Sequence, residues 1–188
     1  MNYICVENNP SARNKGAESS SSKCIAFLDD DDEWYPDKLK TQLPLINDDV
    51  ALVASPYVQE GGECPVNCSK NRGSILARNW VGCTSFPLIK SEMFTKVGGF
   101  DPLMKANQEW ELWMRLLGCG EVAFSDELAG IKHQDVISIT NSRSRRRQSW
   151  FRLFAKHFKD YLKEPGSFCV ALDYCFRDLF RLRAYCSS

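Results

Sequence analysis

Residues 24–39 read CIAFLDDDDEWYPDKL, and this stretch decides which kind of fold the chain can form. Its apolar start is long enough for a strand, and four aspartates, Asp29–Asp32, follow at once. Pro36 prevents a helix from running through the junction, and a new helical pattern begins just after it. An open α/β sheet places its ligand site where buried strands end. The stretch therefore predicts an α/β fold with a ligand site at an acidic loop.

The aspartates predict a bound divalent cation. Side chains at positions i and i+2 of an extended chain point the same way, so Asp29 and Asp31 can share one cation. Mg²⁺ and Mn²⁺ prefer the oxygen ligands that carboxylates supply. Acidic runs are more often solvated loops. This one directly ends an apolar strand and precedes Trp34, a residue that is costly to expose, and both features favour the metal site.

Three known metal-binding motifs could account for this run of aspartates. An EF-hand loop needs glycine at its sixth position, which counted from Asp29 is Trp34, so that motif is excluded. A phosphatase of the haloacid dehalogenase type usually carries Thr or Val where this chain has Glu33, which disfavours it. The third motif is the Asp-x-Asp of nucleotide-sugar-dependent glycosyltransferases, and here the similarity extends well beyond the aspartates.

The wider pattern resembles glycosyltransferase family 2. It consists of ARNKG at 12–16, IAFLDDDDEW at 25–34, which begins nine residues after Gly16, then Pro36 and Lys38-Leu39, with a second block over 82–101. The resemblance covers about residues 3–140 and implies a GT-A fold, a Rossmann-like mixed sheet flanked by helices. Family members normally have two more strands before this start. The resemblance therefore implies a chain that lacks the opening β-α-β unit.

The resemblance also implies a reaction and a set of partners. The reaction is transfer of a sugar, with inversion, from a nucleotide-diphospho-sugar, most simply a UDP-sugar, to a saccharide or lipid-linked acceptor hydroxyl in cell-surface polysaccharide biosynthesis. Asp29, Asp30 and Asp31 would contact the donor, and Mn²⁺ or Mg²⁺ would bind Asp31 with help from Asp29. Arg13 would suit the diphosphate, although a surface arginine would look the same. A non-catalytic remnant that binds a partner is the alternative.

A helix beginning near Asn107 carries the expected general base. Asn107 is a plausible N-cap, and the position that matches the family's base is Glu109, which could instead only compensate the helix dipole. Glu111 stands four residues before Arg115, so an ion pair within the helix explains it. The apolar face of the helix has the spacing i, i+3, i+4, i+7 and consists of Trp110, Trp113, Met114 and Leu117.

His133 and the following Ser138-Ile139-Thr140 resemble the stretch that closes the catalytic domain in relatives. The resemblance implies that His133 touches the metal or the diphosphate; a packed histidine is the alternative. It also divides the chain into a partial GT-A domain at 1–141 and a helical extension at 142–188.

Hydrophobic periodicity and turn residues predict the other elements. Strands are expected at 3–6 and 50–54, the second buried on both faces. Helices are expected from Pro10 to about Ser20, over 38–46 and over 90–97, the last ended by Gly98-Gly99. Residues 60–72 form a loop or hairpin. Two amphipathic helices, 150–161 and 168–185, are separated by Glu164-Pro165-Gly166.

Charge and composition restrict the partners and the cellular location that can be expected. Basic and acidic residues balance at 24 each, which gives no general attraction to nucleic acid. Residues 1–20 lack the apolar core of a signal peptide, and the nine cysteines look like reduced thiols, so a cytoplasmic protein is expected. The C-terminal helices, preceded by arginines at 143 and 145–147, are expected to pack on the domain. Pairing with another subunit and a peripheral contact with the inner face of a membrane are the alternatives.

Overall fold

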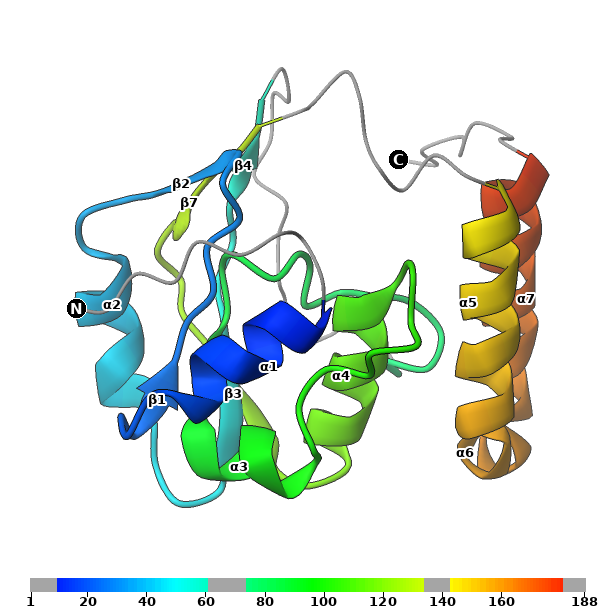
Figure 1. Ribbon diagram of the computed structural model, residues 1–188, viewed down its shortest axis with the longest axis horizontal. Helices are drawn as coiled ribbons and strands as arrows, with labels where there is room; N and C mark the ends of the chain where they lie inside the picture. The colour runs from blue at the N-terminus through cyan, green and yellow to red at the C-terminus, as the bar shows by residue number, and fades with distance from the viewer. Residues whose placement is uncertain (1–9, 61–73, 134–142, 181–188) are drawn as a thin grey trace.

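The computed structural model describes residues 10–60, 74–133 and 143–180 and confirms an α/β fold with mixed sheets flanked by helices (Figure 1). One sheet has the strand order β1-β5-β3-β6 and the other β2-β7-β4. The strands are β1 (Cys24–Ile25), β2 (Asp32–Trp34), β3 (Val50–Ala54), β4 (Val58–Gln59), β5 (Leu88–Lys90), β6 (Glu121–Phe124) and β7 (Gly130–Lys132). The predictions for 3–6, for most of 60–72 and for 138–140 lie outside the described residues.

Strand β3 is the centre of the larger sheet. All five of its residues are buried, which confirms the prediction of a strand covered on both faces. It pairs parallel to β6 and antiparallel to β5, so the sheet is mixed. Ala51, Leu52 and Ala54 join the side chains of α4 (Gln108–Leu117) in the main core, and Val50 and Val53 pack with Leu88 in a second cluster.

Strand β1 is shorter than the sequence predicts. The apolar run 24–28 forms a ladder only at Cys24–Ile25, because the register that pairs Ile25 with Ile89 would bring Phe27 opposite Pro87, which has no N–H to donate. Phe27 instead packs its ring against Phe94 and Phe100. The chain therefore leaves the sheet before it reaches the aspartates.

The expectation that the whole acidic run is a loop is wrong at its end. Asp32 begins β2, which pairs antiparallel to β7 in the second sheet. The pairing is close, because any side chain at Gly130 would collide with the backbone oxygen of Glu33. This second sheet fixes the C-terminal end of the acidic run.

The predicted helices of the domain are present, with two corrections. They are α1 (Pro10–Glu18), α2 (Lys38–Gln42), α3 (Ser91–Lys96) and α4, and a 3₁₀ turn, η1 (Leu43–Leu45), follows α2. The α-helix stops short of Ile46 because Pro44 cannot donate the next backbone hydrogen bond. Asn107 stands at the N-cap of α4 but its side chain makes no capping bond, because its φ is 55°. Gly98 and Gly99 have positive φ, as expected after α3.

Three helices, rather than two, follow residue 142: α5 (Arg143–Lys156), α6 (Phe158–Lys163) and α7 (Pro165–Phe180). Pro165 opens α7 instead of separating two helices, since proline is tolerated in a first helical turn. The preference for packing on the domain is confirmed: Trp150 lies edge-on to Trp110 of α4, and the Tyr161 hydroxyl donates to the Leu76 carbonyl. The described helices include none long and apolar enough to cross a bilayer.

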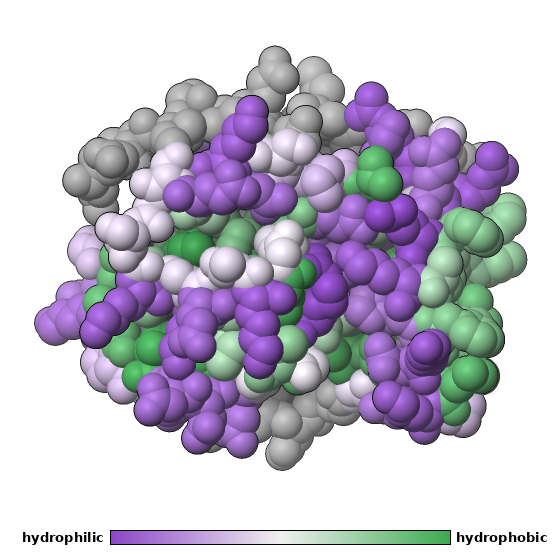
Figure 2. Space-filling view, turned by 60° about the horizontal axis from the view of Figure 1, so that its bottom comes forward, coloured by the Kyte–Doolittle hydropathy of each residue, from purple (hydrophilic) through white to green (hydrophobic). Residues whose placement is uncertain are grey.

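The outer surface of these helices is strongly apolar. Figure 2 shows green side chains gathered over this end of the molecule. The exposed large apolar residues there are Phe151, Phe158, Leu162, Val170, Leu172, Tyr174, Phe176 and Phe180.

Candidate active site

Glu109 lies in the first turn of α4 and is half-buried. Burial raises the pKa of its carboxyl above the usual value, and the charge of Asp29 adds to the rise, while its own backbone N–H, Arg13 and Lys132 oppose it. A carboxylate with a raised pKa is a better proton acceptor near neutral pH. The environment of Glu109 therefore suits the base that the sequence predicts.

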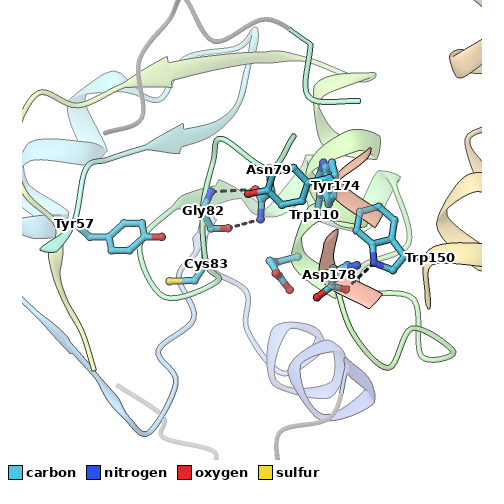
Figure 3. A pocket seen from close by; sticks show the side chains of 10 residues that line it. Tyr57, Asn79, Gly82, Cys83, Trp110, Trp150, Tyr174 and Asp178 are labelled. Carbon is cyan, nitrogen blue, oxygen red and sulfur yellow. Dashed lines mark hydrogen bonds between the residues drawn. The ribbon is translucent and has the colours of Figure 1, made fainter. Parts of the chain in front are cut away.

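A cavity of about 340 Å³ lies beside Glu109 (Figure 3). Tyr57 and Cys83 approach it from one end, Trp150 and Asp178 from the other. The residues that line it are Tyr57, Asn79, Gly82, Cys83, Asn107, Glu109, Trp110, Trp150, Tyr174 and Asp178. The C-terminal helices thus share a cavity with the predicted base, and no sequence pattern indicates this contact between distant segments.

Glu111 points the other way and is fully buried in a cluster of cations. Arg115 donates two hydrogen bonds to its carboxylate, at 2.7 and 2.6 Å, which confirms the predicted pair. Lys156 Nζ and His157 Nε2 lie 2.7 and 3.3 Å from Glu111 Oε1. Although burial opposes the change, the hydrogen bonds from His157 and Arg115 hold the pKa of Glu111 far below its usual range. Glu111 is a structural link between α4 and α5.

Arg13 connects the acidic run to the start of α4. Its guanidinium forms an ion pair with Asp29, and Nη1 donates to Gln108 Oε1 at 3.3 Å. The guanidinium also lies over the Phe100 ring, 5.5 Å from its centroid. The structure thus places Arg13 at the site, bonded to a carboxylate of the predicted metal pair.

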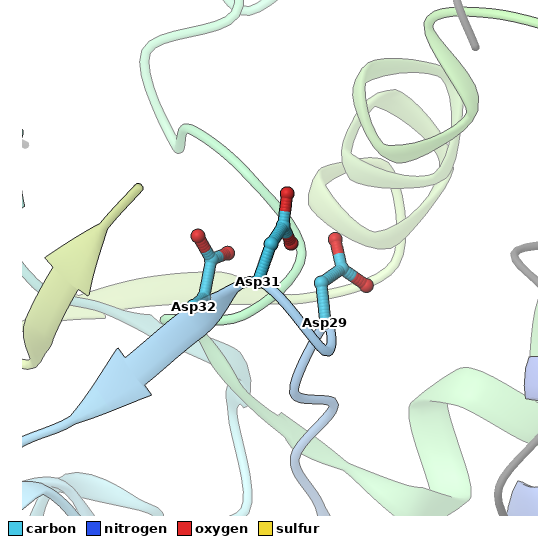
Figure 4. Close-up of side chains that lie close together, drawn as sticks. All are labelled: Asp29, Asp31 and Asp32. Atoms are coloured by element: carbon cyan, nitrogen blue, oxygen red, sulfur yellow. The ribbon is translucent and has the colours of Figure 1, made fainter. Parts of the chain in front are cut away.

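Asp29, Asp31 and Asp32 form a compact acidic cluster (Figure 4). Each offers a carboxylate oxygen, and the three oxygens lie within 4.8 Å of one another on the same side of the loop. Asp30 is exposed and is not one of the three. The predicted pair of Asp29 and Asp31 is therefore brought together, and Asp32 joins it.

Asp32 is the cluster member that the sequence analysis missed. Ser85 Oγ donates to Asp32 Oδ2 at 2.6 Å, and the same hydroxyl accepts from the Asp29 N–H at 3.1 Å. Lys132 Nζ lies 3.8 Å from Oδ1, which is buried and accepts no hydrogen bond from the described residues. Burial raises the pKa of Asp32. The sequence block Gly82–Ser85 was recognised, but nothing in it indicated contact with the aspartates.

His133 is not brought to the acidic cluster. Nδ1 lies 3.1 Å from Glu60 Oε2 and Nε2 lies 3.4 Å from Glu33 Oε1. The hydrogen bond with Glu60 raises the pKa of the imidazole. These contacts make His133 a partner of two glutamates, just after the end of strand β7 in the second sheet.

The sequence matches a known family model. The family model is described as "Glycosyl transferase family 2". This model matches residues 6–96, which include the acidic cluster. An uncharacterized glycosyltransferase of Haemophilus influenzae is 31% identical over 119 residues, 56% of this chain and 40% of that protein. The uncharacterized glycosyltransferase RP339 of Rickettsia prowazekii is 25% identical over 180 residues, 86% of this chain and 56% of that protein. The chain spans about half the length of these curated relatives.

Solved structures share the fold. The crystal structure of S. aureus TarS 1–349 matches 90% of this chain and 60% of its own, with a TM-score of 0.55 and 11% identity. A mannosyltransferase of Pyrobaculum calidifontis, in complex with GDP-Man and Mn²⁺, matches 96% of this chain and 56% of its own, with a TM-score of 0.53 and 12% identity. At such identities these matches establish the GT-A-like fold alone. The family match and the curated relatives show that the chain is similar to glycosyltransferase family 2 over residues 6–96 and to uncharacterized glycosyltransferases beyond them.

Proposed function

We propose that the chain carries the catalytic centre of a metal-dependent, inverting glycosyltransferase that uses a nucleotide-diphospho-sugar. The observation that carries the proposal is the placement of three aspartate carboxylates within 4.8 Å of one another, with Arg13 bonded both to one of them and to the residue before Glu109. Arg13 therefore links the proposed cation site to the helix that carries the candidate base.

Mn²⁺ or Mg²⁺ would be held by Asp31 and Asp29. The donor set fits such an ion, because all three ligands offered are carboxylate oxygens and a buried oxygen of Asp32 accepts no hydrogen bond from the described residues. The metal would supply positive charge for the leaving diphosphate. Arg13 and the exposed Asp30 lie beside the same site and are proposed donor contacts. His133 is not included in the proposed metal site, because it contacts Glu33 and Glu60 instead of the three aspartates.

Glu109 would take the proton of the acceptor hydroxyl as that oxygen attacks the anomeric carbon from the face opposite the diphosphate. Such a direct displacement inverts the configuration at that carbon. Its raised pKa and its place on the cavity wall support this role.

The donor is proposed to be a UDP-sugar and the acceptor a saccharide or a lipid-linked saccharide. A lipid-linked acceptor fits the apolar surface of the C-terminal helices, which could rest on the inner face of a membrane (Figure 2). Exposed cations at Arg145, Arg147, Lys159 and Lys163 on α5 and α6 would favour anionic lipids.

The test is release of nucleoside diphosphate from UDP- and GDP-sugars, with and without Mn²⁺. We expect release from one UDP-sugar that requires the metal and stops with EDTA. Turnover of a GDP-sugar instead would correct the donor. Release that is independent of metal would contradict the proposed centre, and binding of nucleotide without any release would favour a non-catalytic binding protein.

A further inference from the structure

We infer that the cavity beside Glu109 is the acceptor site, and that it selects an uncharged sugar residue held by the aromatic wall of α4 and α7. This inference rests on the proposed function, since Glu109 identifies the cavity as the place where an acceptor hydroxyl reacts. It adds the chemical class of the acceptor and the part of the chain that recognises it.

The position of the cavity is suited to a second substrate. At one end, Cys83 lines the cavity and its Sγ lies 4.0 Å from Asp32 Oδ2 of the acidic cluster. At the other end lie Trp150 of α5 and Tyr174 and Asp178 of α7 (Figure 3). A molecule in this cavity would therefore extend from the proposed donor site to the C-terminal helices, with Glu109 on its wall.

Three aromatic rings form one continuous wall. Trp110 lies edge-on to Trp150, with ring centroids 5.3 Å apart and planes at 89°, and edge-on to Tyr174, at 6.4 Å and 74°. Tyr174 is still 50% exposed, although Trp110 supports it from one side. The face of an aromatic ring carries partial negative charge, and the C–H groups of a sugar ring pack well against it. Tyr174 is therefore the platform on which a sugar ring would lie.

The polar groups of the cavity match hydroxyls rather than phosphates. The described lining residues include two carboxylates, Glu109 and Asp178, and no lysine or arginine. Asn107 Nδ2 is buried and has no hydrogen-bond partner among the described residues, so it can donate to a ligand oxygen. Asp178 Oδ1 lies 3.6 Å from Arg146 Nε, so the carboxylate that disfavours a phosphate in this cavity is mainly that of Glu109. A volume of about 340 Å³ is at the small end of ligand sites, as one sugar residue requires.

The wall of the cavity formed by α5 and α7 is held in place by hydrogen bonds. Ser149 Oγ accepts hydrogen bonds from the backbone N–H groups of Lys105 and Ala106, at 3.1 and 2.9 Å, next to the start of α4. Trp150 Nε1 donates to Asp178 Oδ2 at 2.8 Å, which joins α5 to α7. A rigid wall lowers the entropy cost of binding.

The test compares two exposed aromatics of one helix. Tyr174→Ala removes the platform, and Phe176→Ala is the matched control, since Phe176 is 55% exposed on α7 but does not line the cavity. The probes are methyl β-glucoside, methyl β-galactoside and N-acetylglucosamine, with glucose 6-phosphate as the charged comparator. Binding is followed by saturation-transfer NMR with UDP and Mn²⁺ present. UDP binding with Mn²⁺ is measured by calorimetry in the same samples.

We expect at least one neutral sugar to bind, and Tyr174→Ala to weaken it roughly five- to tenfold, the worth of one aromatic contact. Phe176→Ala and Tyr174→Phe should bind as the wild type does. Failure of all three neutral sugars, equal binding by Tyr174→Ala, or preference for glucose 6-phosphate would each overturn the inference. If UDP still binds with Mn²⁺ in that case, the proposed donor site stands. Loss of UDP binding in the wild type would instead contradict the proposed function.

Discussion

Helix α4 presents two glutamates to two very different surroundings. Glu109 faces the cavity near Asp29, and burial raises its pKa, whereas Glu111 is fully buried among Arg115, Lys156 and His157, which lower its pKa. The pKa values of two residues of the same type, two positions apart, are thus shifted in opposite directions.

The difference separates carboxylates that stabilise the fold from carboxylates that are available for a ligand. Glu111 has its negative charge balanced by three basic side chains, so nothing further can bind it. The acidic cluster has three carboxylates against Arg13 and Lys132, and one buried oxygen of Asp32 accepts no hydrogen bond from the described residues. Excess negative charge held in place by a fold is what a bound cation compensates.

The largest effect is expected on stability, from a change at the structural residue Glu111. Glu111→Ala should lower the free energy of unfolding by about 3–5 kcal/mol, because it removes the fully buried carboxylate that Arg115, Lys156 and His157 share between α4 and α5. Urea unfolding measures the change. Glu109→Ala is the matched control and should change stability by less than about 1 kcal/mol. Equal losses in the two variants would remove the distinction between the two glutamates.

Glu109→Gln should reduce turnover and leave stability nearly unchanged, the opposite of the change at Glu111. Turnover should fall by roughly 10²-fold or more, since the amide cannot accept the proton, while UDP binding and stability stay close to the wild type. Glu111→Gln should keep its turnover per folded molecule within about threefold. If Glu111→Gln abolished turnover and Glu109→Gln did not, the base would be two residues from where the family pattern places it.

The two environments also differ in how stability depends on pH. The folded-state pKa of Glu111 lies below its usual value of 4.5, so the unfolded chain binds the proton more readily. Its contribution is therefore complete above pH 4.5 and is lost as the pH falls through the folded value, at up to about 1.4 kcal/mol per pH unit. Acid unfolding of Glu111→Gln should have a shallower slope below pH 4.5 than the wild type. An identical slope would show that the cations do not hold Glu111 ionised.

Lys38 shows the opposite situation to Glu111. It is a buried basic residue with no carboxylate partner among the described residues. Its Nζ donates to Gln42 Oε1 at 2.8 Å and lies 4.4 Å from the Trp34 ring centroid. Burial lowers the pKa of Lys38 to about 7. The unfolded chain keeps the proton to higher pH, so stability should rise between pH 7 and 8.5 by about 1 kcal/mol or more. In Lys38→Met that rise should disappear, which chemical unfolding at the two pH values can test.

The sequence predicted the parts that are set by local chemistry. The buried strand β3, the helices α1 and α4, the positive φ of Gly98 and Gly99, and the pair of Glu111 with Arg115 all follow from periodicity, turn residues or helical spacing. Asp29 and Asp31 come together as predicted, but through a turn closed by the hydrogen bond from the Asp32 N–H to the Asp29 carbonyl rather than through strand alternation.

The parts that were missed depend on contacts between distant segments. Asp32 enters a strand because β7, about 100 residues later, pairs with it, and Ser85 reaches it from a separate loop. Lys156 and His157 join Glu111 only once α5 packs on α4, so the sequence showed an ordinary i,i+4 pair where the structure has a buried charge network. Periodicity along the chain carries no information about such pairings.

The most direct measurement is the effect of Mn²⁺ on thermal unfolding of the wild type, of Asp31→Asn, and of Asp37→Asn as an exposed acidic control. Asp37 lies outside the cluster and only pairs with Lys40 at 3.5 Å. We expect Mn²⁺ to stabilise the wild type and Asp37→Asn, by about 2.7 kcal/mol at 100 times the dissociation constant, and to leave Asp31→Asn unchanged. Equal shifts in all three proteins, or no shift in the wild type, would contradict a metal site at the acidic cluster.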